Sequence, residues 1–164
     1  MKSVVASSAC LLFVGLVAAG CAGMRAVEVG ATQEAVRAAL GAPTVQAKTS
    51  AGERWAYSSA PEGKQVWLLD FDRSRRLVSR VQGLTISRVT QVTQGQTQAE
   101  VEALIGPSYW TLRYPFRQDE LVHVYRFNDA ALPMCFYVGY NTSGTVSSTG
   151  MQEELRSAMM ARPC

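Results

Sequence analysis

The sequence predicts an α+β fold made of two tandem modules, each a short helix packed on a three-stranded antiparallel sheet, with a helix at the C-terminus. The main observation is an internal repeat: GATQEAVRAALG at 30–41 returns as GQTQAEVEALIG at 95–106, with six of twelve positions identical. The second observation is that segments of alternating apolar and polar residues, typical of half-buried strands, follow each copy. An offset of 65 residues is too long for a solenoid unit and fits a helix with a small meander.

The first twenty residues are typical of an export signal. Lys2 precedes an apolar run from Val4 to Ala19, which ends in small residues and is too short for a stable transmembrane helix. The segment LVAAGC at 16–21 resembles the lipobox of bacterial lipoproteins, in which the cysteine is acylated and begins the mature chain. We therefore expect a signal peptide over 1–20 and acyl chains, palmitate among them, on Cys21. An ordinary cleaved signal is the alternative.

Acylation would also decide where the protein lies. Several acyl chains on one cysteine give durable membrane anchoring. Ala22 stands where an aspartate would resemble the inner-membrane retention signal. The resemblance thus implies the outer membrane, with 21–28 as a linker and the folded part facing the periplasm. A net charge of only +3 in an exported chain argues against a nucleic-acid partner.

The first module is expected over 29–83. Thr32 is a candidate N-cap, because its hydroxyl can accept from the unpaired N–H groups of a first helical turn. Gly41 suits the left-handed position after a helix, and Pro43 prevents continuation. Strands are expected at 53–59, 64–72 and 76–81.

The second module is expected over 95–149. Thr97 and Glu100 form a T-x-x-E capping box, and Gly106-Pro107 ends the helix. One short helix on a three-stranded sheet is poorly stable alone, so the two copies are expected to share a core. Strands are expected at 121–129, 134–141 and 145–149, an extended or strand connector at 84–94, and a helix within 150–164.

Two cysteines are candidates for a disulfide. Of the four in the chain, Cys10 leaves with the signal and Cys21 is blocked by lipid. An even pair of remaining thiols in an oxidising compartment predicts a bond between Cys135 and Cys164. Two unpaired cysteines are the alternative.

The repeated residues resemble a known lipoprotein domain. Gly30-Ala31-Thr32, Leu40-Gly41 with Pro43, Trp55 with Tyr57, and Phe71-Asp72 resemble the SmpA/OmlA (BamE-like) family, and Gly95, Thr97, Gly106-Pro107 and Tyr125 with Phe127 repeat the pattern in weaker form. The resemblance implies a non-catalytic scaffold or interaction subunit of the outer-membrane β-barrel assembly machinery, with contact to phosphatidylglycerol. The tandem copy departs from the family and is reminiscent of the β-lactamase-inhibitor-protein-like fold. Arg75 also stands where the family usually has glycine.

Catalysis has little support in the sequence. His123 is the only histidine, and a lone strand histidine is more often a surface or packing residue than a base. Asp70 and Asp72 lie two apart and therefore on one strand face, where they could bind a cation or transfer protons. The stronger interpretation is that Asp72 caps a turn. We expect no enzyme, no catalytic residue, no metal and no cofactor.

Two groups of residues are candidate binding sites. For each group the alternative is a purely structural role. The first is basic and would contact anionic lipid or acidic partner loops; the second is aromatic and has the residue types enriched at binding hot spots. The basic group is Arg73, Arg75, Arg76 and Arg80, and the aromatic group is Tyr109, Trp110, Tyr114 and Phe116, with Arg113 and Arg117 nearby.

The sequence therefore supports two functions. The first is a scaffold in envelope protein assembly, whose partners are envelope proteins and the membrane. The second is a periplasm-facing inhibitor or ligand-binding lipoprotein with a concave tandem sheet. An open sheet edge that accepts a partner's strand is a further possible contact.

Overall fold

The computed structural model describes residues 23–154 and Cys164. Its first half contains one α-helix and an antiparallel sheet of order β1-β2-β3-β4. After Pro43 the chain turns back and adds a strand ahead of those expected, so the sheet has four strands rather than three. The elements are a 3₁₀ turn η1 (Met24–Ala26), α1 (Gln33–Leu40), β1 (Val45–Lys48), β2 (Gly52–Ser58), β3 (Val66–Asp72) and β4 (Leu77–Gln82).

The second half repeats this plan with a sheet of order β5-β6-β7-β8. The α+β class with tandem sheet modules is confirmed, and again a strand precedes those expected. No helix among the described residues is long and apolar enough to cross a membrane. The elements are α2 (Ile86–Val89), α3 (Gln98–Ile105), β5 (Trp110–Tyr114), β6 (Arg117–Asp129), β7 (Leu132–Tyr140) and β8 (Val146–Glu153).

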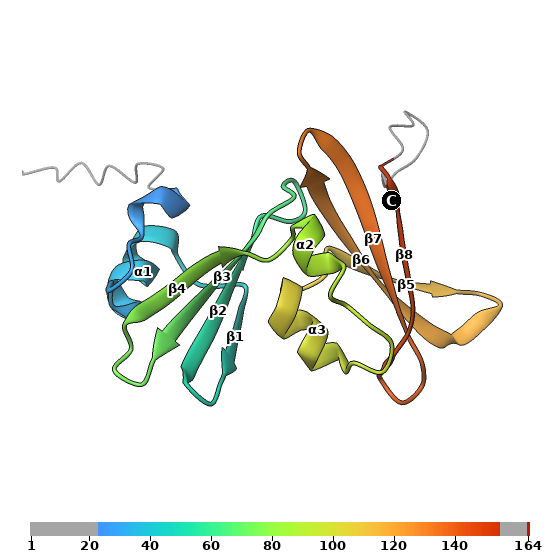
Figure 1. Ribbon diagram of the computed structural model, residues 1–164, viewed down its shortest axis with the longest axis horizontal. Coiled ribbons are helices and arrows are strands. Elements are labelled where there is room, and N and C mark those ends of the chain that lie inside the picture. Colours follow the sequence, from blue (N-terminus) through green and yellow to red (C-terminus); the bar gives the residue numbers. More distant parts are fainter. Residues whose placement is uncertain (1–22, 155–163) are drawn as a thin grey trace, which may run out of the picture.

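Four layers stack in the order α1, first sheet, α3, second sheet (Figure 1). Alternate side chains of β3 point to opposite faces of the first sheet. Leu69 and Phe71 pack on the α1 side, whereas Val66 and Leu68 belong to the core around α3. That larger core also contains residues of the second sheet, such as Tyr125. The two modules therefore share a core, with α3 as its centre.

The helix ends match the sequence predictions. Thr32 accepts from the Ala35 N–H at 3.2 Å, and Thr97 with Glu100 forms a complete capping box. Gly41 and Gly106 follow the helices with φ of 80° and 86°, a region that favours glycine. These local signals were sufficient because a cap and a C′ glycine need only neighbouring backbone.

The backbone joints of the two modules are also repeated. Gly30 donates to the Leu77 carbonyl at 2.7 Å, and Gly95 donates to the Val146 carbonyl at 2.9 Å. Each helix thus begins where its preceding segment joins the last strand of its own sheet.

Two expectations for irregular segments were wrong. The connector 84–94 contains the short helix α2 instead of a strand, with Val89 buried against the α3 core. The C-terminal helix was expected from its composition, but 151–153 continue β8, because they complete the ladder with β7. The remainder of that predicted helix, 155–163, lies outside the described residues.

Two arginines contact the last turn of α3, and one of them, Arg54, connects the first half of the chain to the second. Arg54 forms a two-bonded ion pair with Asp70, its Nη2 lying 2.8 Å from Asp70 Oδ2, and also donates to the Ala103 carbonyl at the end of α3. Arg88 of α2 donates to the Leu104 carbonyl at 2.7 Å. A cation near the C-terminal end of a helix is stabilising, because the last carbonyls lack helical partners and the helix dipole is negative there. Arg54 therefore helps to hold α3 against the first sheet, and Arg88 helps to hold it against α2.

Candidate functional site

The structure divides the predicted arginine group. Arg76 donates to the Gly30 carbonyl at 3.0 Å, and Arg80 donates to the Met24 carbonyl at 2.6 Å while its guanidinium lies over the Trp67 ring. Both arginines therefore hold the N-terminal segment against β4. Their bonds support the structural interpretation of these two residues.

Arg73 and Arg75 lie on the exposed turn between β3 and β4. Arg73 donates to the Ser50 carbonyl at 3.2 Å, and Arg75 has φ of 61°, which explains why glycine would suit this position. Asp72 accepts from the Arg76 N–H at 3.0 Å and so caps the turn. Arg75 is the member of the predicted group that faces an open hollow.

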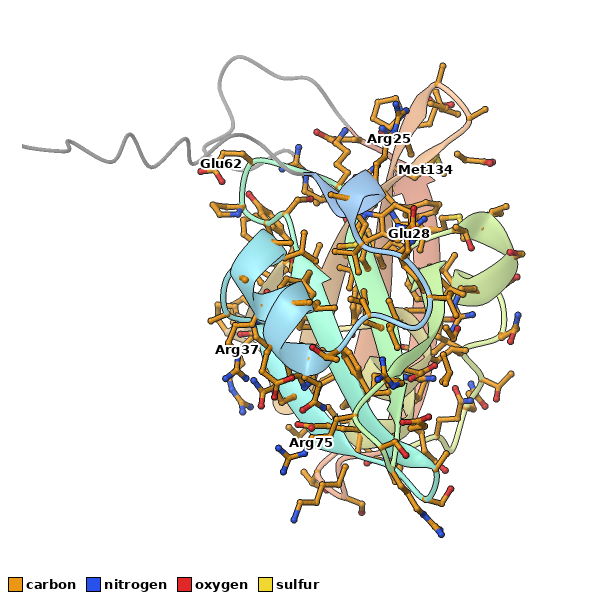
Figure 2. All side chains as sticks on the ribbon, turned by 90° about the vertical axis from the view of Figure 1, so that its left-hand side faces the viewer. Arg25, Glu28, Arg37, Glu62, Arg75 and Met134 are labelled. Atoms are coloured by element: carbon orange, nitrogen blue, oxygen red, sulfur yellow. A yellow bond between two sulfur atoms is a disulfide. The ribbon has the colours of Figure 1, made fainter. Side chains whose placement is uncertain are left out.

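That hollow, of about 380 Å³, lies between α1 and the β3–β4 turn. Figure 2 shows the side chains of Arg37 and Arg75 extending outward on this side of the molecule. Arg37 was not predicted; its guanidinium lies 4.9 Å from the Trp55 ring centre. The signal that could have found it is the repeat itself, because Arg37 stands where the second copy has Glu102.

Among the described residues that line this hollow, Glu34 is the one acid. The pKa of Glu34 is lowered, first by a backbone N–H of the helix start, then by the Thr32 side chain, and to a smaller degree by Arg75 and Arg37. Its charge opposes anion binding at one edge, so an anion would lie toward Arg37 and Arg75.

The predicted aromatic group lies on the hairpin of β5 and β6. Tyr109 stacks near Trp110, with 5.3 Å between ring centres, and the Arg126 guanidinium lies 5.0 Å from the Tyr109 ring. These two aromatics therefore pack against the protein. Tyr114 is 47% exposed and Phe116 is 100% exposed.

The hairpin tip extends beyond the second sheet (Figure 1). It lies at one end of the molecule's long axis, and η1, where the described chain begins, lies toward the other. The turn between β3 and β4, with its arginines, also lies at the η1 end. The end of the long axis that contains η1 thus also carries these arginines, and the aromatic tip lies at the opposite end.

The residues considered for catalysis are held in packing and ion-pair contacts. His123 is 3% exposed and meets Tyr140 edge-on at 4.8 Å; burial lowers the pKa of His123. Asp70 is held by Arg54. The described residues contain no group of three His, Cys, Asp or Glu side chains placed to hold a metal. The absence of an enzyme activity stays a prediction.

The two cysteines considered for pairing are joined. Cys135 of β7 and Cys164 form a disulfide with a Cα–Cα distance of 5.9 Å. The bond attaches the last residue of the chain to the second sheet. Cys21, the predicted lipid attachment, lies outside the described residues.

A groove between the modules was not predicted. It has a volume of about 240 Å³ and a mainly apolar lining from β1, β2, β3 and α3, including Val45, Ala47, Leu68, Ala99 and Ala103. Ala99 and Ala103 are four apart on α3 and so lie on one helix face. Only the packing of the two modules brings these residues together with β1.

No family model and no curated protein matches the chain. Among solved structures, it is similar to a putative osmotically inducible lipoprotein, OsmE, with 23% identity over 42% of this chain and 78% of that one, at a TM-score of 0.38. It is also similar to a DUF4309 family protein, YjgB, from Bacillus subtilis, with 19% identity over 75% of this chain and 78% of that one, at a TM-score of 0.31. Neither likeness assigns a family or an activity to this chain.

Proposed function

We propose that the chain is a non-catalytic lipoprotein of the bacterial outer membrane, facing the periplasm, that binds other envelope proteins during their assembly. The observation that supports a binding role best is the β5–β6 tip, where Phe116 is fully exposed and Tyr114 nearly half exposed. Leaving aromatic surface in water forgoes about 1.5–3 kcal/mol for a side chain such as phenylalanine. A partner that buries Phe116 recovers that free energy.

The position of the tip fits this role. An anchor on Cys21 would hold the molecule by the residues immediately before Met24, where η1 begins. Because η1 and the tip lie at opposite ends of the long axis (Figure 1), the aromatic tip would point away from the membrane. It would therefore meet proteins in the periplasm rather than the lipid surface.

Affinity purification of the anchored protein from gently solubilised envelope tests this proposal. We expect subunits of the β-barrel assembly machinery to co-purify with the wild type, and to be lost with Cys21→Ala and with the double change of Tyr114→Ser and Phe116→Ser. Leu132→Ser, another exposed apolar residue on the second sheet, is the matched control. Equal recovery with and without the aromatic changes would remove the tip from the proposal.

A different result would favour the second function from the sequence. If one unrelated envelope protein dominates the purification and is lost with the tip variant, the chain is a dedicated inhibitor or ligand-binding lipoprotein. The split of the aromatics, two packed and two exposed, is compatible with either kind of partner.

Contact with anionic lipid is proposed for the arginines at the η1 end. Arg37, Arg73 and Arg75 lie on the end that an acylated Cys21 would hold at the membrane, and each basic residue near an anionic surface contributes about 1 kcal/mol. Vesicles with and without phosphatidylglycerol test this with unlipidated protein. We expect Arg37→Gln with Arg75→Gln to weaken binding, and Arg113→Gln, on the opposite end, to leave it unchanged.

A further inference from the structure

The β8 edge of the second sheet differs from the other sheet edges. All residues from Ser147 to Glu153 are exposed, and no other described segment pairs with this edge beyond Ser147. The strand carries no charge before Glu153 and no proline. A long, uncharged edge strand is a template for pairing with another strand.

The other three edges have the protective features that natural sheets use. The N-terminal segment covers β4, through the backbone bonds that Gly30 and Ala31 form with Leu77 and through the donations of Arg80. The strand β1 is only four residues long and ends in Lys48. The strand β5 is short, has an irregular register after Leu112, and carries Arg113.

The outward hydrogen-bonding groups of β8 follow from its register with β7. Glu154 donates to the Pro133 carbonyl at 2.9 Å, so this pair faces inward. Residues alternate along an antiparallel strand, and Gln152, Gly150 and Ser148 therefore bond to β7. Thr149, Met151 and Glu153 then direct their backbone N–H and C=O groups outward.

The side chains of β8 leave that edge accessible. Ser148 donates to Glu120 at 3.1 Å and Gln152 donates to the Tyr137 hydroxyl at 2.8 Å, so both are held on the sheet's own face. A Cβ added at Gly150 would meet no atom within 4 Å. Met151, on the other face, is 37% exposed beside its buried partner Phe136.

We infer that β8 pairs in antiparallel fashion with β8 of a second copy, joining two four-stranded sheets into one. An antiparallel edge is self-complementary about a two-fold axis, because its outward donors meet the outward acceptors of the same strand reversed. With Met151 opposite Met151 of the other copy, each methionine covers the other and Glu153 lies opposite Thr149. In this register the two copies place no acidic residues opposite each other. A partner strand with charged side chains fits less well, because residues 146–152 carry no charge that could pair with them.

Sedimentation velocity of the full exported chain with Cys21→Ala tests this inference without the membrane. We expect a reversible dimer with a dissociation constant on the order of micromolar, as for an interface of modest area. Met151→Lys places two like charges opposite each other and should weaken the dimer by about tenfold or more. Thr111→Lys, on the β5 edge of the same sheet, should leave it unchanged.

A backbone variant separates edge pairing from side-chain effects. Thr149→Pro removes one outward N–H without removing a bond to β7, and should also weaken the dimer, with an unchanged far-UV spectrum as the check on folding. A monomer at every concentration up to about 200 µM would overturn the inference, since even a small specific interface is detectable there. A dimer that survives both β8 variants, or that Thr111→Lys also disrupts, would overturn it too.

Discussion

The two modules share their local construction and differ in what surrounds it. Both helices begin at a threonine cap and end at a glycine with positive φ. The helix α1 covers one outer face of the first sheet, whereas α3 lies between two sheets (Figure 1). A Cβ on Gly41 would meet nothing within 4 Å, but one on Gly106 would lie 2.3 Å from Val66 Cγ1. Duplication thus kept the helix signals and gave one copy a second packing surface.

The last strands differ in a similar way. The N-terminal segment and two arginines cover β4, while β8 is longer and exposed from Ser147 onward. The first module also has basic residues where the second has none: Arg37 and Arg75 correspond to Glu102 and Gly144. The copies have therefore diverged at their surfaces more than at their helix ends, and the surfaces are where we place their functions.

The largest expected effect separates the two terminal glycines. Gly106→Ala should destabilise the protein by about 2–5 kcal/mol, because positive φ costs an alanine about 1–2 kcal/mol and overpacking against buried Val66 adds about 1–3. Gly41→Ala should cost only about 1–2 kcal/mol from its backbone conformation. Urea denaturation of both variants measures the difference. Equal losses would mean that α3 is not packed between the sheets.

An intermediate effect should come from the connection at the end of α3. Arg54→Met leaves the part-exposed Asp70 unpaired and removes a donor from the Ala103 carbonyl. We expect a loss of about 1–2 kcal/mol, since bonds to charged groups contribute more than neutral ones but solvent screens this pair. Arg73→Met, on the exposed turn, is the control. In a double-mutant cycle, Asp70→Asn should cost less once Arg54 is absent; strict additivity would contradict the pairing.

The smallest expected effect is a pH dependence of stability that comes from one histidine of the second module. Burial lowers the pKa of His123 below its ordinary 6.5, and Glu53 takes the same place in the first module. Below pH 6.5 the unfolded chain takes up a proton that the folded chain does not, so stability should fall as pH decreases from about 7.5 to 5.5, by at most about 1.4 kcal/mol over that whole range. Since the chain has one histidine, His123→Phe should flatten this slope in thermal denaturation. An unchanged slope would assign it to other groups.

The parts of the fold that the sequence predicted depend on neighbouring residues. The caps at Thr32 and Thr97 and the alternation of 64–72 are visible in short windows. The strand β1 was missed because it has only four residues, VQAK, whose apolar and polar alternation is too short to predict a strand by itself. The end of β8 was mistaken for a helix because Met151, Gln152 and Glu153 are good helix formers, and only the ladder with β7 decides otherwise.

The candidate site was predictable to a similar degree. Residue type indicated the aromatic hairpin, but sequence gave no means of separating the packed Tyr109 from the exposed Phe116. The hollow beside α1 combines Arg37 with Arg75, which are far apart in the chain and meet only through sheet packing. Arg76 and Arg80 look identical to Arg75 in sequence, and their structural role depends on carbonyls of the N-terminal segment.

The central position of α3 has a consequence for the order in which the protein can fold. Ribosomes release a chain from its N-terminus, so the first sheet emerges before the helix that covers its inner face. Until residues 98–105 follow, Ala56, Val66 and Leu68 have no cover on that side. A first half that folded before the second was released would therefore expose this apolar face until α3 covered it.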